Sequence, residues 1–592
     1  MYRSICEALE GSSLSAYEVF GAHPDDNGVR FTVYAPNAVS VAVIGDFNGW
    51  TDSRMVRTDN GVWTSYVNGA KQGDLYKYRI KTADGEVFDR ADPFAFFSEK
   101  RPDTASVVYD IGGYEWTDSD WVKKRSKNFS APLNIYEVHA GSWKKKSGEF
   151  MTYTELADEL IPYTKEIGAT HIELLPITEH PFDGSWGYQS AGYFSATSRY
   201  GNPHRLMQFI DRCHAEGIGV ILDFVPVHFV RDYFALAKFD GGYIYESDYD
   251  DMRNSQWGTV LFDFTKPYVV SFLRSALEFW ITEYHIDGIR FDAVSNMIYR
   301  NGESNCGINE SGIWFLKYTN YTLSKRHPDV MLITEDSSVF GKVTAPVEYG
   351  GLGFDYKWEL GWMNNTLNFL SLPPERRRGK SSAIDHSMSY FYNENYLLPL
   401  SHDEVVHGKK SLLEKMYGSN EEKLAQLRLL YLYIFSHPGK KLLFMGSELA
   451  SHREWNEAAE LEWENLSSPD GEEISRFVRE LYRIYRSERA LYECDFDNRK
   501  FKWLDFSGRN CAFSYTRYDS DGKRLFFVLN FSNEKIKYNL NTDRAKGFEV
   551  LLDTDSKAFG GGGEFALGNK INMGRLEISL PAYSGVMLRE KE

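Results

Sequence analysis

Gly288-Ile289-Arg290-Phe291-Asp292-Ala293-Val294 is the stretch that decides the fold of this 592-residue chain. An apolar run that carries only Arg290 and Asp292 as charged residues is typical of a strand buried on both faces of a parallel sheet. Helical stretches flank it at 269–285 and 311–326. This alternation of strand and helix predicts an α/β domain with the stretch at its centre.

The same alternation extends in both directions, from about 130 to 445. Apolar strands are predicted at 134–139, 171–177, 220–227, 288–294, 330–335, 396–400 and 441–445, with an uncertain eighth at 353–358. Further helices are predicted at 152–168, 204–216 and 421–436. This pattern indicates a (β/α)8 TIM-type barrel. A doubly wound open sheet is the alternative, but Val138-His139-Ala140-Gly141-Ser142-Trp143 is not the Gly-rich phosphate loop that such a sheet normally carries.

β-rich sequence lies on both sides of the barrel region. Val29, Phe31 and Val33 alternate with polar residues, and such period-2 runs predict an all-β sandwich at 15–112, after an N-terminal tail at 1–14. Runs at 502–505, 512–516, 525–531, 548–553 and 578–588 predict a second sandwich at 490–592. We therefore expect a multidomain protein, with a central (β/α)8 barrel at 113–489 flanked by an N-terminal and a C-terminal β-sandwich.

Composition excludes several kinds of partner. The net charge of −17, from 67 Lys+Arg against 84 Asp+Glu, disfavours nucleic acid and acidic membranes. The 5 cysteines are scattered and form neither a disulfide framework nor a zinc motif. The first residues lack the apolar stretch of a signal peptide, and no window is apolar enough to span a bilayer. We expect a soluble cytoplasmic protein whose substrate is a sugar or a peptide rather than a polyanion.

Polar residues cluster where four of the predicted strands end, which is where barrel enzymes place their active sites. They are Asp223 with His228, Arg290 with Asp292, Glu335, and His402 with Asp403. Each has a structural alternative when taken alone. Buried Asp–Arg pairs are often structural, Asp223 and His228 could form a satisfied hydrogen bond, Glu335 could cap a helix, and His402-Asp403 could lie in a solvated turn. Their joint occurrence at strand ends favours one shared site.

Several carboxylates beside an arginine suit the cleavage of a glycosidic bond. In retaining enzymes one carboxylate attacks the sugar while a carboxylic acid about 5–5.5 Å away protonates the leaving oxygen. Arg290 is expected to keep Asp292 ionised, and the crowding of carboxylates is expected to keep Glu335 protonated. Asp403 beside His402 can hold the sugar hydroxyls.

With these residues the chain resembles the α-amylase superfamily and, within it, the glycogen branching enzymes. The segments around Asp223–His228, Gly288–Val294, Thr334–Glu335 and His402–Asp403 match the superfamily in order, and the loops Glu179–Gln189 and Leu398–Lys409 are similar to those of branching enzymes. The resemblance implies that Asp292 is the nucleophile, Glu335 the general acid/base and Asp403 the transition-state stabiliser. It implies that Tyr188 stacks on the cleaved glucose, and that the same sugar subsite is lined by Asp223, His228, Arg290 and His402.

The same resemblance implies a substrate and a reaction. The partner is glycogen or another α-glucan, and the expected reaction moves a chain from an α-1,4 bond to a 6-hydroxyl. A hydrolase of the superfamily is the alternative, and a non-catalytic glucan-binding protein is a third. Val227 stands where many amylases have a calcium-binding asparagine, so the resemblance implies no structural calcium at that position, which branching enzymes generally lack. No other metal and no cofactor is expected. The first sandwich resembles a carbohydrate-binding module. For the oligomeric state, a monomer is favoured.

Overall fold

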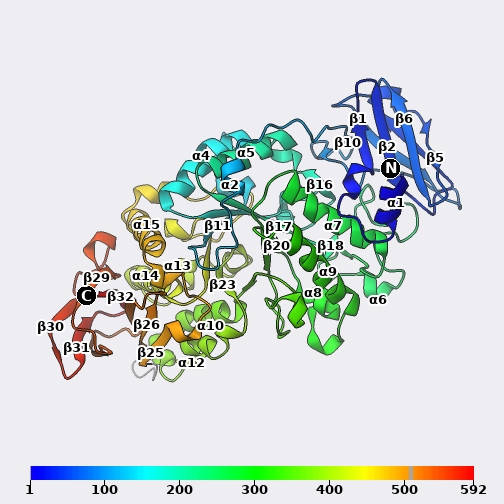
Figure 1. The fold of residues 1–592 in the computed structure, drawn as a ribbon. Coiled ribbons are helices and arrows are strands. Elements are labelled where there is room, and N and C mark those ends of the chain that lie inside the picture. The colour runs from blue at the N-terminus through cyan, green and yellow to red at the C-terminus, as the bar shows by residue number, and fades with distance from the viewer. Residues whose placement is uncertain (1, 506–510, 592) are drawn as a thin grey trace. The chain divides into compact units, whose positions relative to one another are not determined.

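The computed structural model describes residues 2–505 and 511–591 (Figure 1). The chain divides into two compact units. Unit 1 comprises Met1–Lys127, Lys145–Ile161 and Glu173–Asp355. Unit 2 comprises Asn128–Lys144, Pro162–Ile172 and Tyr356–Glu592.

The predicted barrel is confirmed, and among the described residues its eight strands form a closed ring. In ring order the strands are β11 (Asn134–Val138), β14 (His171–Leu174), β17 (Gly219–Phe224), β20 (Gly288–Phe291), β21 (Met331–Thr334), β22 (Tyr356–Trp358), β23 (Tyr396–Leu400) and β24 (Lys440–Phe444). The uncertain strand at 353–358 is therefore real, although β22 is only three residues long.

The barrel strands are buried on both faces, as their apolar runs predicted. Every residue of β17, β20 and β21 is buried. These strands are parallel neighbours, with Asp223 opposite Arg290 and Phe291 opposite Thr334. This register brings the carboxyl ends of the three strands to one level.

Long helices follow the strands, and their first turns carry recognisable caps. Asn202, Asn309 and Ser468 accept hydrogen bonds from backbone N–H groups of the helices that follow them, and Ser419 and Glu422 form a capping box. The helices are α4 (Tyr153–Ile167), α5 (Pro203–Ala215), α7 (Pro267–Thr282), α9 (Glu310–Arg326), α10 (Leu360–Ser371), α14 (Asn420–Ser436) and α15 (Pro469–Ser487).

The N-terminal module is a pair of antiparallel sheets within unit 1, seen as the blue strands in Figure 1. One sheet has the order β1 (Gly21–Pro24), β2 (Gly28–Tyr34), β6 (Val62–Asn68), β5 (Val56–Arg57). The other has the order β4 (Ser53–Arg54), β3 (Ser40–Gly45), β7 (Leu75–Lys81), β10 (Ser106–Val107), β9 (Phe97–Ser98), with β8 (Val87–Arg90) paired to β7. The alternating Val29, Phe31 and Val33 are buried, as their period-2 pattern predicted. The segment expected as a tail contains helix α1 (Tyr2–Leu9), which packs against α7.

The C-terminal module is a second pair of sheets, within unit 2. One sheet has the order β25 (Phe501–Asp505), β26 (Ala512–Tyr518), β27 (Arg524–Asn530), β32 (Ser584–Glu590), β29 (Phe548–Asp553). The other has the order β28 (Ile536–Asn541), β31 (Arg575–Leu580), β30 (Ala566–Asn572). The single strand expected at 578–588 was wrong, because β31 and β32 lie in different sheets. Pro581 and Tyr583, whose φ is 51°, separate them.

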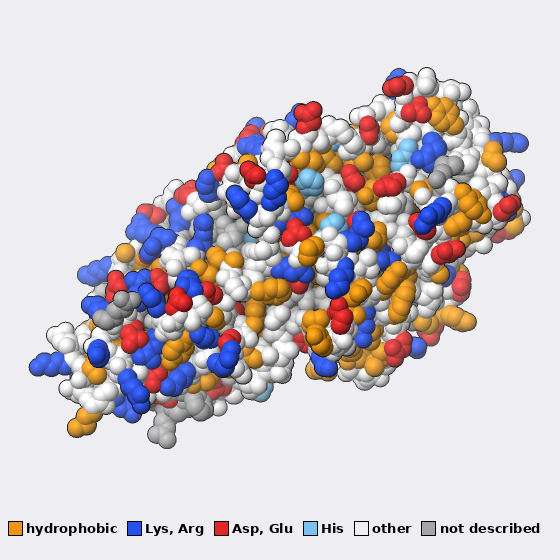
Figure 2. Space-filling view, viewed as in Figure 1, with side chains coloured by type: hydrophobic (Ala, Val, Ile, Leu, Met, Phe, Trp, Pro, Cys, Tyr) orange, Lys and Arg blue, Asp and Glu red, His pale blue; other side chains and the backbone are white. Residues whose placement is uncertain are grey.

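The surface mixes charges of both signs. On the face that Figure 2 shows, acidic side chains lie among basic ones rather than in one patch. No helix in residues 2–505 and 511–591 combines the length and the apolar composition needed to cross a membrane.

Candidate active site

Arg290 is the centre of a charged cluster in unit 1. Its side chain is 1% exposed, and Nη1 donates to both oxygens of Asp223, at 2.8 and 2.9 Å, and to Oδ1 of Asp292 at 2.8 Å. Nη2 lies 3.6 Å from Oε2 of Glu335. Burial alone would lower the pKa of this guanidinium, but the surrounding carboxylates and Tyr188 raise it well above its usual value. The guanidinium therefore stays charged and links three carboxylates.

Asp292 and Glu335 lie at the same level at the ends of neighbouring strands. Phe291 is opposite Thr334 in the β20–β21 register, so the next residue on each strand is Asp292 and Glu335. Parallel neighbours are spaced about 4.8 Å apart, which suits a pair that flanks one bond. Both side chains keep access to solvent, at 14% and 21% exposed.

Ala293, in the turn that directly follows Asp292, contacts the carboxylate of Glu335. Its φ is 48°, a left-handed conformation that is unusual for a residue with a Cβ. The Ala293 N–H donates to Oε2 of Glu335 at 2.8 Å. Strained backbone of this kind clusters at functional sites, where the surrounding structure holds it in place. Here it ties the position of Glu335 to the turn that follows Asp292.

Tyr188 reaches the cluster from the loop after β14. Its hydroxyl donates to Oδ2 of Asp223 and lies 3.5 Å from Nη1 of Arg290. Gly187 precedes it with a φ of 95°, and a Cβ there would come within 2.0 Å of the Pro176 carbonyl oxygen. Only glycine fits this close approach, so Gly187 sets the path of the backbone into Tyr188.

The stem of the same loop is fixed by Arg199, whose side chain is 2% exposed. Its Nη1 donates to Glu179 at 2.6 Å and its Nε to Asp183 at 2.8 Å. The loop that presents Tyr188 is thus held by the buried guanidinium of Arg199, which pairs with Glu179 and with the partly exposed Asp183.

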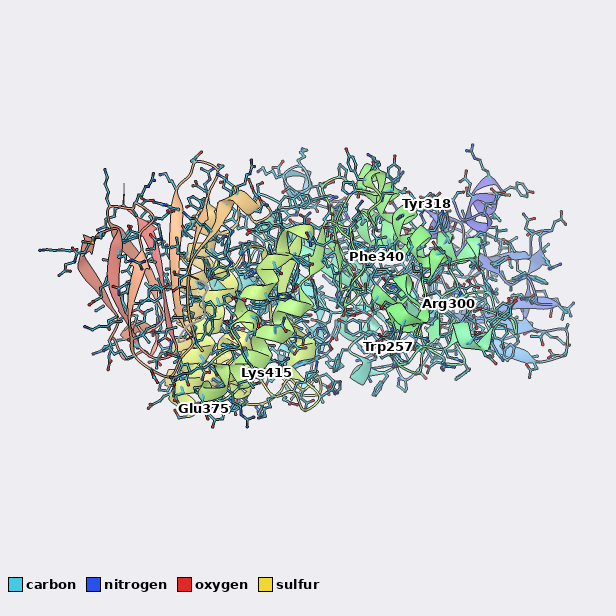
Figure 3. All side chains as sticks on the ribbon, turned by 90° about the horizontal axis from the view of Figure 1, so that it is seen from below. Trp257, Arg300, Tyr318, Phe340, Glu375 and Lys415 are labelled. Carbon is cyan, nitrogen blue, oxygen red and sulfur yellow. The ribbon has the colours of Figure 1, made fainter. Side chains whose placement is uncertain are left out.

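His228 lies on the short strand β18 (His228–Phe229), downstream of β17. Its ring centroid is 5.0 Å from that of Trp257, which is labelled in Figure 3. Burial lowers the pKa of His228 to about 4. The imidazole is therefore neutral at neutral pH and can both donate and accept a hydrogen bond.

His402 and Asp403 follow β23 in unit 2. His402 is 2% exposed, Asp403 is 56% exposed, and His402 Nε2 lies 3.6 Å from Asp403 Oδ1. The Nδ1 atom of His402 is bonded to Glu137 on β11 at 2.6 Å. Glu137 was not among the predicted site residues, although it is the kind of signal that identified Asp292, a charged residue within an apolar strand.

Within each unit, then, the structure brings predicted residues together. Hydrogen bonds or charge contacts connect Tyr188, Asp223, Arg290, Asp292 and Glu335 in unit 1, and His402 contacts Asp403 in unit 2. His228 lies on β18 beside Trp257. The catalytic and binding roles of all these residues stay predictions.

Comparisons with protein families find three matching models. They are Carbohydrate-binding module 48 (Isoamylase N-terminal domain) at residues 19–95, Alpha amylase, catalytic domain at residues 140–257, and Alpha amylase, C-terminal all-beta domain at residues 503–591. Each matched range lies within the corresponding predicted domain.

Individual proteins match over nearly the whole chain. The 1,4-alpha-glucan branching enzyme GlgB of Bacillus caldolyticus is 48% identical, covering 94% of this chain and 85% of that protein. The GlgB of Geobacillus stearothermophilus is 47% identical, covering 94% and 89%. Among solved structures, a pullulanase from Paenibacillus barengoltzii in complex with maltohexaose and alpha-cyclodextrin superposes with a TM-score of 0.76 at 18% identity, covering 99% of this chain and 97% of that one. The last comparison supports the fold alone.

Proposed function

Because this chain belongs to the family of 1,4-α-glucan branching enzymes, we propose that Asp292, Glu335 and Asp403 carry out a retaining transfer of an α-glucan chain. The observation that carries the proposal is the placement of Asp292 and Glu335 at one level on adjacent strands, linked by Ala293 and Arg290.

In the first half of the reaction Asp292 is the nucleophile. One of its oxygens attacks the anomeric carbon of a glucan, and the α-1,4 bond breaks. Glu335 gives its proton to the departing 4-oxygen, which leaves as a new chain end. The product is a glucosyl ester on Asp292, and Arg290 favours the carboxylate form from which this attack starts.

In the second half Glu335 takes the proton of the acceptor 6-hydroxyl while that oxygen attacks the anomeric carbon held in the ester, and the Asp292 carboxylate leaves. The ester bond breaks, Asp292 regains its charge, and an α-1,6 branch is formed. Each of the two displacements inverts the configuration of the anomeric carbon, so the α configuration is retained overall. Water in place of the 6-hydroxyl would give hydrolysis with the same carboxylates.

The remaining residues bind the sugar. Tyr188 offers a ring face for stacking on the cleaved glucose. Polar contacts to its hydroxyls come from Asp223, His228, Arg290, His402 and Asp403. The neutral imidazole of His228 can either donate to a hydroxyl or accept from one.

Incubation with amylose tests the proposal. Branching lowers the iodine absorbance with almost no new reducing ends, whereas an α-glucan hydrolase releases reducing ends steadily. A glucan-binding protein without activity would change neither signal. Asp292→Asn should abolish branching, while Asp263→Asn, which changes a partly exposed carboxylate in the same unit, should not. An active Asp292→Asn enzyme would overturn the mechanism.

We also propose that the protein is a monomer and is located in the cytoplasm. Size-exclusion chromatography tests the first statement and cell fractionation tests the second.

A further inference from the structure

Glu137 is a buried carboxylate that contacts the loop after β23. It is 0% exposed, and its neighbours in β11 are buried as well. A carboxylate in such a place is costly unless several hydrogen-bond donors surround it. The hydrogen-bond donors around the Glu137 carboxylate therefore indicate the role of this residue.

Within residues 2–505 and 511–591, the Glu137 carboxylate accepts hydrogen bonds from two consecutive residues. His402 Nδ1 lies 2.6 Å from Oε1, the Ser401 hydroxyl donates to Oε1 at 2.9 Å, and the His402 backbone N–H donates to Oε2 at 3.1 Å. Both carboxylate oxygens are thus used to hold His402, one on its ring and one on its backbone.

The barrel register explains how Glu137 reaches this loop. β11 pairs with β24, and β24 pairs with β23, whose last residue Leu400 is opposite Leu443. Glu137 is opposite Phe444, one step beyond Leu443. The Glu137 side chain therefore bridges from the first barrel strand, past β24, to the residues that follow β23.

The contact defines which nitrogen of His402 carries the proton that Glu137 accepts. A carboxylate only accepts, so Nδ1 must carry the proton in this bond. The other nitrogen, Nε2, is directed to the side of Asp403, 3.6 Å away. Carboxylate partners fix the tautomer and orientation of functional imidazoles in this way in other enzymes.

We propose that Glu137 is a positioning residue that fixes the ring of His402, so that Nε2 is held ready for a hydroxyl of the reacting sugar. The inference rests on the proposed function, in which His402 binds that sugar. Glu137 itself does not touch the substrate. Its effect on the reaction passes through His402.

β11 also contacts the loop after β24, through Tyr136 and Glu448, and this second contact supplies a matched control. Tyr136, the neighbour of Glu137, donates its hydroxyl to Glu448 in the loop after β24 at 2.8 Å, and Tyr163 donates to the same oxygen at 2.6 Å. Glu448 is buried, at 2% exposed, and its carboxylate is held by Tyr136 and Tyr163, whereas His402 is held by Glu137. Glu448→Gln therefore disturbs a comparable carboxylate without affecting the proposed link.

A double-mutant cycle tests whether Glu137 acts through His402. We expect Glu137→Gln to lower kcat for branching of amylose by about 10- to 100-fold, with KM changed by less than about 3-fold. In a His402→Ala background the same substitution should lower kcat by less than about 3-fold, because the partner is gone. Glu448→Gln should have effects of equal size in both backgrounds.

The inference would be overturned by a Glu137→Gln enzyme with wild-type kcat, or by a loss that stays at full size in the His402→Ala background. A His402→Ala enzyme as active as wild type would overturn it too. A wild-type protein that makes no branches would instead refute the proposed function. Should Glu137→Gln fail to fold, Ser401→Ala removes one donor to the same carboxylate, and its smaller loss should likewise vanish in the His402→Ala background.

Discussion

His214 is predicted to make the stability of unit 1 depend on pH. The side chain lies on α5 and is 0% exposed, with Nδ1 2.8 Å from Asp118 and Nε2 2.9 Å from Asp287. Burial would lower the pKa of His214, but the two carboxylates outweigh it and raise the pKa from 6.5 to about 9. Asp287 directly precedes β20, the strand that carries Arg290. The ion pair thus anchors the end of β20 opposite to the charged cluster.

The sign and size of the effect follow from the two pKa values. In the unfolded chain the imidazole titrates near 6.5, and in the folded chain near 9. Between these values the folded state keeps a proton that the unfolded state releases, so stability falls as pH rises. The stabilisation is complete below pH 6.5, amounts to about 3 kcal/mol, and is lost as pH rises through 9. Burial alone would raise the pKa of Asp118, but its contacts with His214 and with His285, whose Nδ1 lies 2.9 Å from Oδ2, lower it.

Hydrogen exchange of α5 and β20 is the suitable assay, because a chain of two units need not unfold in one step. At pH 6, His214→Gln should reduce the protection factors of these elements by roughly 100-fold relative to wild type. At pH 9.5 the difference should shrink to less than about 5-fold, because wild type has lost its charge as well. A difference between the two proteins that stays constant from pH 6 to 9.5 would refute the reasoning.

Three substitutions test other features of the site and its surroundings. Arg290→Lys should lower kcat by about 100-fold or more, because an ammonium cannot bridge several carboxylates at once, and steady-state kinetics with a thermal-unfolding control would show it. Gly187→Ala should lower kcat/KM by about 100-fold, because its Cβ would collide with the Pro176 carbonyl and displace Tyr188; activity near that of wild type would contradict the role given to this turn. Trp50→Ala should weaken glycogen binding by about 3- to 10-fold, since this indole is 38% exposed and can stack on sugar, and unchanged affinity in a sedimentation assay would leave Trp50 a packing role only.

The barrel could be predicted because each of its strands is a short apolar run, and because Asp292 and Glu335 interrupt or end such runs. The failure at 578–588 has an equally local cause. Both β31 and β32 are rich in apolar residues, so the sequence pattern predicted one continuous strand. Pro581, which has no backbone N–H to donate to a sheet, was not taken as its end. β28 and β30 were not predicted because their exposed faces interrupt the apolar pattern.

Contacts between residues far apart in sequence could not be predicted from the sequence. His402 lies 265 positions from Glu137, and His214 lies 96 from Asp118 and 73 from Asp287. These contacts depend on strand register and helix packing, which residue types alone do not specify. Glu137 could have been proposed as a functional residue from its place in an apolar strand, but its partner could not have been named.

The pairing of β11 with β24 has a consequence for how the protein is made. β11 begins at Asn134 and its partner strand begins at Lys440, about 300 residues later. A ribosome adding roughly 5–20 residues per second needs on the order of 15–60 s to cover that distance. Throughout this time the nascent chain offers an unmatched strand edge to other chains. Translation that stops before β24 leaves the ring open, and the shortened product is expected to aggregate.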